Sequence, residues 1–91
     1  MGSEVTLAAK AAETLRHLGD HASADSALAQ IANGLQSPSV IERRATVRWI
    51  QQIGGRTALV FLQSTYENDP DLAVRTDAGK ALRVVTESLA E

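Results

Sequence analysis

The sequence predicts an all-α fold, and two observations carry that prediction. Alanine and leucine supply most of the apolar residues, which make up 44% of the chain, whereas Trp49, Phe61 and Tyr66 are the aromatic residues. This composition is typical of closely packed helices, because alanine costs least in a helix and lets neighbouring helices approach one another. The β-branched residues are scattered singly rather than in alternating runs, so strands are not expected.

The chain of 91 residues, 1–91, is expected to form one domain with a single modest core. Met1-Gly2-Ser3 has the form of a cloning remnant and carries no structural argument. The absence of cysteine excludes disulfides and thiolate chemistry but leaves the redox compartment undetermined. No apolar run approaches the roughly 18–20 residues of a membrane span, and no signal-peptide pattern opens the chain. A cytoplasmic location is therefore expected.

Five helical segments follow one another without a long linker. In each of them apolar residues recur at three- and four-residue spacing, and glycine, proline or aspartate marks the boundaries. On the first segment this spacing predicts a buried stripe made of Leu7, Ala11, Leu15 and Leu18. The segments span residues 4–18, 24–35, 37–55 with its end signals, 57–67 and 71–90.

The third segment has the clearest end signals. Ser37 is expected to cap the free N–H groups of the first turn, and Pro38 is tolerated there because that turn needs no donor. Gly54-Gly55 ends the segment, since glycine readily takes the left-handed conformation of a helix terminus. The face expected to be buried carries Thr46, Val47, Ile50 and Ile53.

The segments form an internal repeat with a period of just over thirty residues. The second and fourth segments align at an offset of 31, the first and third at 35, and the third and fifth at 32. Leu15, Ile50 and Leu82 become equivalent in this alignment, so we expect them to form one continuous buried row. The offsets change only in the turns, where stacked helical hairpins tolerate insertions.

The last segment resembles the second helix of a HEAT repeat, in the short subtype first described in phycobilisome lyases. The resemblance rests on Asp71-Leu72-Ala73-Val74-Arg75, then Ala78, Ala81-Leu82 and Val85, and on Leu18-Gly19 and Ile53-Gly54 in the other copies. It implies a right-handed α-α superhelix of about two and a half hairpins, in which the second helix of each hairpin lines the concave side. Glu42 stands where the family has an apolar residue, so Ile41 is expected to pack in its place.

Two arginines at equivalent positions, Arg43 and Arg75, allow a structural and a ligand-binding interpretation. The resemblance favours the structural one, in which such an arginine bonds aspartates and carbonyls in the turns of adjacent repeats. Asp69 and Asp71 are at hand for this role, and a guanidinium suits a two-pronged contact with a carboxylate. Trp49 is likewise expected to pack against a neighbouring helix rather than to serve as a binding hot spot.

The sequence contains no catalytic motif. It has no nucleophile elbow, no His-Glu-x-x-His and no arranged carboxylate pair, so an enzyme is not expected, and no cofactor is assigned. His17 and His21 have the spacing of two metal ligands on one helical face, but Gly19-Asp20 interrupts the helix between them, so a metal site is not favoured. The expected function is that of a protein-binding scaffold. An accessory subunit of a bilin lyase or isomerase and a nucleic-acid-binding HEAT-like domain are the alternatives.

The candidate partner-binding residues come from aligning the three equivalent helices. Their outward positions form rows with six basic and two acidic residues, although the whole chain has a net charge of −2. A positive face would steer an acidic protein or peptide, whereas the scarcity of aromatics for stacking disfavours nucleic acid. The alternative is that these are ordinary solvated positions whose charges happen to cluster. The basic residues are Lys10, Arg16, Arg44, Arg48, Lys80 and Arg83.

The two ends of the stack raise a further expectation. A solenoid leaves its terminal repeats uncovered unless they carry polar caps. The first helix is rich in alanine on several sides, including Ala8 and Ala9, and Val84 lies outside the core stripe of the last one. We therefore expect either self-association through a terminal helix or an origin within a longer repeat array.

Overall fold

The computed structural model describes residues 2–90, and the side chains of residues 4–90. This part of the chain is all-helical and contains no strand, which confirms the predicted fold class. One short 3-10 helix, η1, follows α2. The elements are α1 (Gly2–His17), α2 (His21–Ile31), η1 (Ala32–Gln36), α3 (Val40–Ile53), α4 (Arg56–Asn68) and α5 (Leu72–Ala90).

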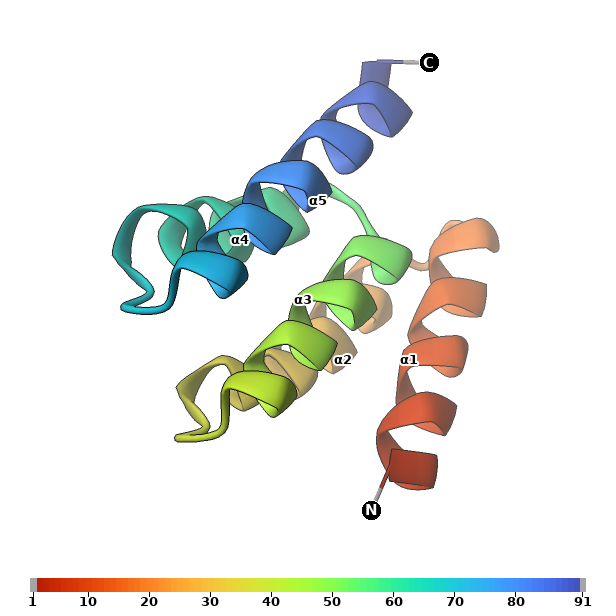
Figure 1. The fold of residues 1–91 in the computed structure, drawn as a ribbon. Coiled ribbons are helices and arrows are strands. Elements are labelled where there is room, and N and C mark those ends of the chain that lie inside the picture. The colour runs from red at the N-terminus through yellow and green to blue at the C-terminus, as the bar shows by residue number, and fades with distance from the viewer. Residues whose placement is uncertain (1, 91) are drawn as a thin grey trace.

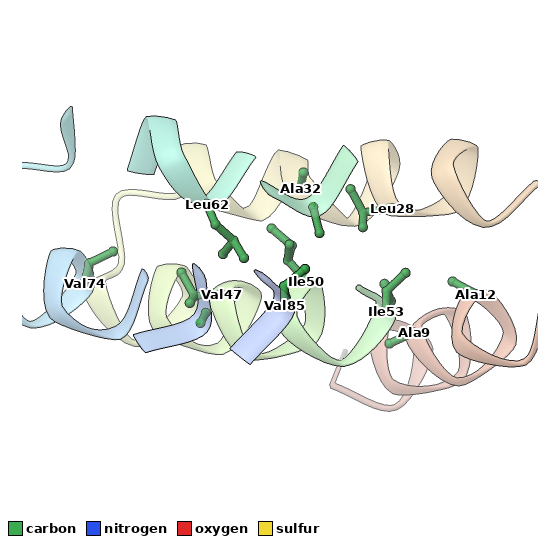
Figure 2. Close-up of a cluster of buried hydrophobic side chains, with 12 residues drawn as sticks. Ala9, Ala12, Leu28, Ala32, Val47, Ile50, Ile53, Leu62, Val74 and Val85 are labelled. Atoms are coloured by element: carbon green, nitrogen blue, oxygen red, sulfur yellow. The ribbon is translucent and has the colours of Figure 1, made fainter. Parts of the chain in front are cut away.

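The helices lie in two layers. One layer holds α1, α3 and α5, and the other holds α2 with η1 and α4 (Figures 1 and 2). The backbone measures 35 × 32 × 15 Å, and its shortest dimension matches two helices packed one on the other. Within the first layer α3 contacts both α1 and α5. The helix α3 is therefore covered on two sides by its own layer and on a third by α2, η1 and α4.

The core lies between the layers and is built from small and medium apolar side chains (Figure 2). Ile50 of α3 is completely buried, with Leu28 from α2 and Leu62 from α4 above it. Leu15 and Leu82, which were expected to continue the row of Ile50, are only half-buried. The prediction of a continuous buried row is thus wrong at both ends, because α1 and α5 have a neighbour on only one side within their layer.

The predicted stripe of α1 is also wrong. Leu7 and Leu18 are 71% and 77% exposed, and Ala11 is exposed as well. The buried residues are Ala9 and Ala12, which were not in the expected stripe. Their small side chains let the backbone of α1 approach its neighbours α2 and α3 closely, and Leu18 lies just beyond the last residue of the helix.

The start of α3 differs from the expectation by two residues. The capping residue is Ser39, whose hydroxyl accepts the N–H of Glu42, and the helix begins at Val40. Ser37, the predicted cap, instead accepts the N–H of Ser39 and so shapes the turn that leads into the helix. At the other end Gly54 and Gly55 have φ values of 68° and 89°, which confirms the predicted glycine stop.

The second predicted helix is divided into two pieces. Asp20 caps α2 by accepting the N–H of Ser23, so the helix begins at His21 rather than Ala24, and η1 takes over after Ile31. Gly34 lies in η1 against α3, where a Cβ atom would lie 2.2 Å from Oγ1 of Thr46. The close approach of η1 to α3 therefore depends on this glycine.

Candidate binding surface

Two interhelical turns, 37–39 and 69–71, repeat the same hydrogen-bond pattern at the offset of 32 residues. The first side chain of each turn, Ser37 or Asp69, accepts the N–H two residues later. The third side chain, Ser39 or Asp71, caps the helix that follows. The internal repeat inferred from the apolar pattern therefore extends to the polar details of its turns.

Arg43 joins these two turns. Its Nη1 donates to the carbonyl of Ser37 in its own turn at 2.9 Å, while Nε and Nη2 donate to the two carboxylate oxygens of Asp69 at 3.0 and 3.3 Å. Both side chains are almost fully buried. Arg75 makes the contact equivalent to the first of these, from Nη1 to the carbonyl of Asp69 at 2.7 Å. The expected contact with the turn of an adjacent repeat is confirmed for Arg43, whereas in the described part of the chain the guanidinium of Arg75 bonds only the carbonyl of its own turn.

The six candidate basic residues fall into two groups. Lys10, Arg48, Lys80 and Arg83 are exposed, and within residues 4–90 no carboxylate forms an ion pair with any of them. Arg48 lies on the side of α3 opposite Ile50, and Lys80 lies on the side of α5 opposite Ala78. These positions face away from the second layer, so the charges lie on the outer surface of the α1/α3/α5 layer. We call this surface the basic face.

Arg16 does not contribute a free charge to the basic face. Its Nη2 donates to Asp25 of α2 at 2.6 Å and to the carbonyl of Gly54 at 2.9 Å, and Nη1 lies 3.2 Å from Nδ1 of His21. The guanidinium also lies against Gly55, where a Cβ atom would come within 2.5 Å of Cζ. Arg16 thus joins α1 to α2 and to the end of α3, and the absence of a Cβ atom at Gly55 leaves room for its guanidinium.

Arg44 is also paired. Its Nε donates to Asp77 of α5 at 2.7 Å, across the junction between α3 and α5. The hydrogen bond that Arg44 donates to Asp77 and the Coulombic attraction of this carboxylate raise the pKa of Arg44 above its usual value. Ala9, which is equivalent to Arg44 at the offset of 35 residues and was therefore expected to face outward, is buried. The free positive charge of the basic face is therefore smaller than the alignment predicted.

Three large apolar side chains on this layer are exposed although the apolar pattern of the sequence did not predict it. Leu7, Ile41 and Leu72 are 71%, 80% and 69% exposed. They lie near the starts of α1, α3 and α5, which run in the same general direction (Figure 1). Ile41 was expected to pack inside, and that expectation is wrong. The signal was present in the pattern, because residue 41 falls on the same side of α3 as Arg48, two turns away.

His17 is the last residue of α1 and His21 is the first residue of α2, and both side chains are exposed. They line a pocket of about 610 Å³ together with Arg16 and Arg56. Among the residues whose side chains are described, no group of three or more His, Cys, Asp or Glu side chains is placed to hold a metal ion. The third ligand of such a site would have to be Asp20 or Asp25, but Asp20 caps α2 and Asp25 is bonded to Arg16.

Trp49 is half-buried and packs against the core, as expected. It also lines a groove of about 710 Å³ between α1, α2 with η1 and α3, together with Val5, Ala27 and Ile31.

In the described part of the chain no helix combines the length and the apolar character that a bilayer crossing requires. Comparison with protein-family models, curated proteins and solved structures gives no significant match to this chain.

Proposed function

We propose that this chain is a non-catalytic protein-protein interaction module, a HEAT-like solenoid of about two and a half hairpins. The repeated turns, the Arg43–Asp69 contact and the two-layer arrangement of the helices support the solenoid interpretation. Such arrays bind partners through extended surfaces formed by equivalent helices. The surface that serves here is the basic face.

The observation that carries the proposal is the combination of free charge and exposed apolar side chains on the basic face. Four cations without an ion pair lie on the same layer as Leu7, Ile41 and Leu72. Large exposed apolar residues that occur beside charged ones are typical of interaction surfaces. The partner is therefore an acidic protein segment that also carries apolar side chains, for which the charges supply orientation and the apolar residues supply affinity.

Titration with designed peptides tests this proposal. A labelled helical peptide with glutamates on one face and leucines beside them is expected to bind, and its affinity to fall steeply as salt increases. A peptide of equal charge in which alanines replace the leucines is expected to bind more weakly, because it leaves Ile41 and Leu72 uncovered. A single-stranded oligonucleotide of equal charge that binds as tightly as the first peptide would contradict the protein-binding proposal.

Two arginine variants locate the binding surface. Arg48→Glu reverses a charge on the basic face, whereas Arg56→Glu makes the same change at the exposed first turn of α4, in the other layer. Only the first change is expected to weaken peptide binding, and a glutamate in the first turn of a helix is well tolerated. Equal losses in the two variants would show that net charge alone attracts the peptide, and would contradict a defined surface.

A further inference from the structure

The contacts of Arg43 and Arg75 differ in one respect. All three donor nitrogens of Arg43 are used. One donates to the carbonyl of its own turn, and two donate to the carboxylate of Asp69 in the equivalent turn of the next hairpin. In Arg75 the bond to its own turn is present, but Nε and Nη2 have no acceptor in the described part of the chain. The two donors that are unused in Arg75, Nε and Nη2, are therefore the same two that Arg43 uses to bind the next hairpin.

The apolar residues of the hairpin that carries Arg75 are also less buried than their equivalents in the hairpin that carries Arg43. Leu59 and Leu82 are half-buried, whereas the residues equivalent to them one hairpin earlier, Leu28 and Ile50, are completely buried. The α4/α5 hairpin covers those earlier residues, whereas Leu59 and Leu82 pack against the core on one side and no further hairpin in residues 2–90 covers their other side. Leu59 and Leu82 line a shallow groove along this hairpin, together with polar side chains that include Gln63 and Thr86.

We propose that the outer face of the α4/α5 hairpin binds a helical hairpin of another protein, whose interhelical turn supplies an aspartate to Arg75. The contact seen within the chain defines what this partner carries. Its turn resembles Asp69-Pro70-Asp71, and its carboxylate accepts from Nε and Nη2 of Arg75 as Asp69 accepts from Arg43. The flanking helices bring apolar side chains onto Leu59 and Leu82.

A second copy of the folded chain is not the partner. Its Asp69 is already bonded to its own Arg43 and is only 9% exposed, so it is not available to another molecule. The docking surface also differs from the basic face, because Arg75, Leu59 and Leu82 are half-buried residues at the end of the two-layer stack. The two surfaces can therefore be tested independently.

The test uses the full chain and a synthetic peptide with the sequence of residues 54–91, which contains the Asp69 turn and whose helical fold is first established by circular dichroism. Binding is measured by calorimetry with this peptide and with its Asp69→Asn version. Asparagine keeps an oxygen for the N–H of residue 71, so the turn is retained, but the charged contact with Arg75 is lost. The asparagine peptide is expected to bind about tenfold more weakly or worse, as for a lost charge-assisted hydrogen bond.

Arg75→Lys in the full chain provides the matched control. Lysine keeps the positive charge but cannot form the two-pronged contact, so the same loss is expected with the original peptide and no further loss with the asparagine peptide. Absence of binding, or equal affinity of the two peptides, would overturn the proposal. Binding that Arg75→Lys leaves unchanged would also overturn it, because the peptide would then have replaced the chain's own hairpin on Arg43. Sedimentation of the full chain alone is expected to show a monomer, and a dimer that Arg75→Lys abolishes would contradict the choice of partner.

Discussion

The guanidinium of Arg43 joins the equivalent turns of two successive hairpins, because it donates to both carboxylate oxygens of Asp69, 26 residues further along the chain. The same arginine bonds the carbonyl of Ser37, so a single side chain fixes the start of α3 relative to the start of α5. Asp69 in turn accepts the N–H of Asp71, which caps α5. The spacing of two hairpins is thereby tied to the polar residues of their turns.

Removing Arg43 is expected to destabilise the fold strongly. Arg43→Ala would leave the buried carboxylate of Asp69 without its cation, a loss of about 3–5 kcal/mol in comparable buried pairs. Arg48→Ala removes an exposed, unpaired arginine from the same helix and should change stability by about 0.5 kcal/mol or less. Urea unfolding followed by circular dichroism measures both. Equal midpoints for the two variants would contradict the structural role of Arg43.

A methyl group at residue 34 is expected to push η1 away from α3. Gly34→Ala would bring a Cβ atom within 2.2 Å of Oγ1 of Thr46, and overpacking of this kind costs about 1–3 kcal/mol. In a Thr46→Ala background the nearest atom is absent, so the same change should cost clearly less. Thermal unfolding of the four proteins of this double-mutant cycle measures the coupling. Strict additivity would show that the two residues do not meet.

The register of α1 can be checked with two substitutions. Ala12→Leu adds three carbon atoms at a fully buried position and should cost about 1–3 kcal/mol. Leu7→Gln alters a residue that is largely exposed, so stability should stay within about 0.5 kcal/mol of the original. The periodicity of the sequence alone predicts the opposite order. Denaturant midpoints that follow this opposite order would restore Leu7 to the core.

Local signals predicted the number and type of the helices well. Gly54-Gly55 and Asp69-Pro70 mark helix boundaries that lie where they were expected, within one or two residues. The stripe of α1 could not be predicted in this way, because Leu7 and Ala9 are both apolar and only tertiary packing selects the alanine. The half-buried position of Leu15 could not be predicted either, because the apolar pattern does not show that α1, as the first helix of its layer, lacks a neighbour on one side.

The exposure and pairing of the candidate residues were predicted in part, and their binding role stays a prediction. Alignment of the repeats correctly singled out exposed cations such as Arg48 and Lys80, since equivalent outward positions share exposure. It could not show that Arg16 and Arg44 are paired, because Asp25 and Asp77 lie on other helices. Pairing between side chains depends on the distance between helices, which a one-dimensional alignment does not contain.

The most direct test of the binding proposal is a charge exchange on the basic face. The variant Arg48→Glu/Lys80→Glu changes two exposed residues outside the core, so its thermal unfolding should match that of the original chain. It is titrated with the glutamate-leucine peptide and with a lysine-leucine peptide of the same length. The original chain is expected to prefer the acidic peptide by about tenfold or more, because its basic face attracts the glutamates of the peptide. The variant is expected to prefer the basic peptide, because its two introduced glutamates repel the acidic one. If the original chain and the variant bind the acidic peptide with the same affinity, the basic face is not the binding surface.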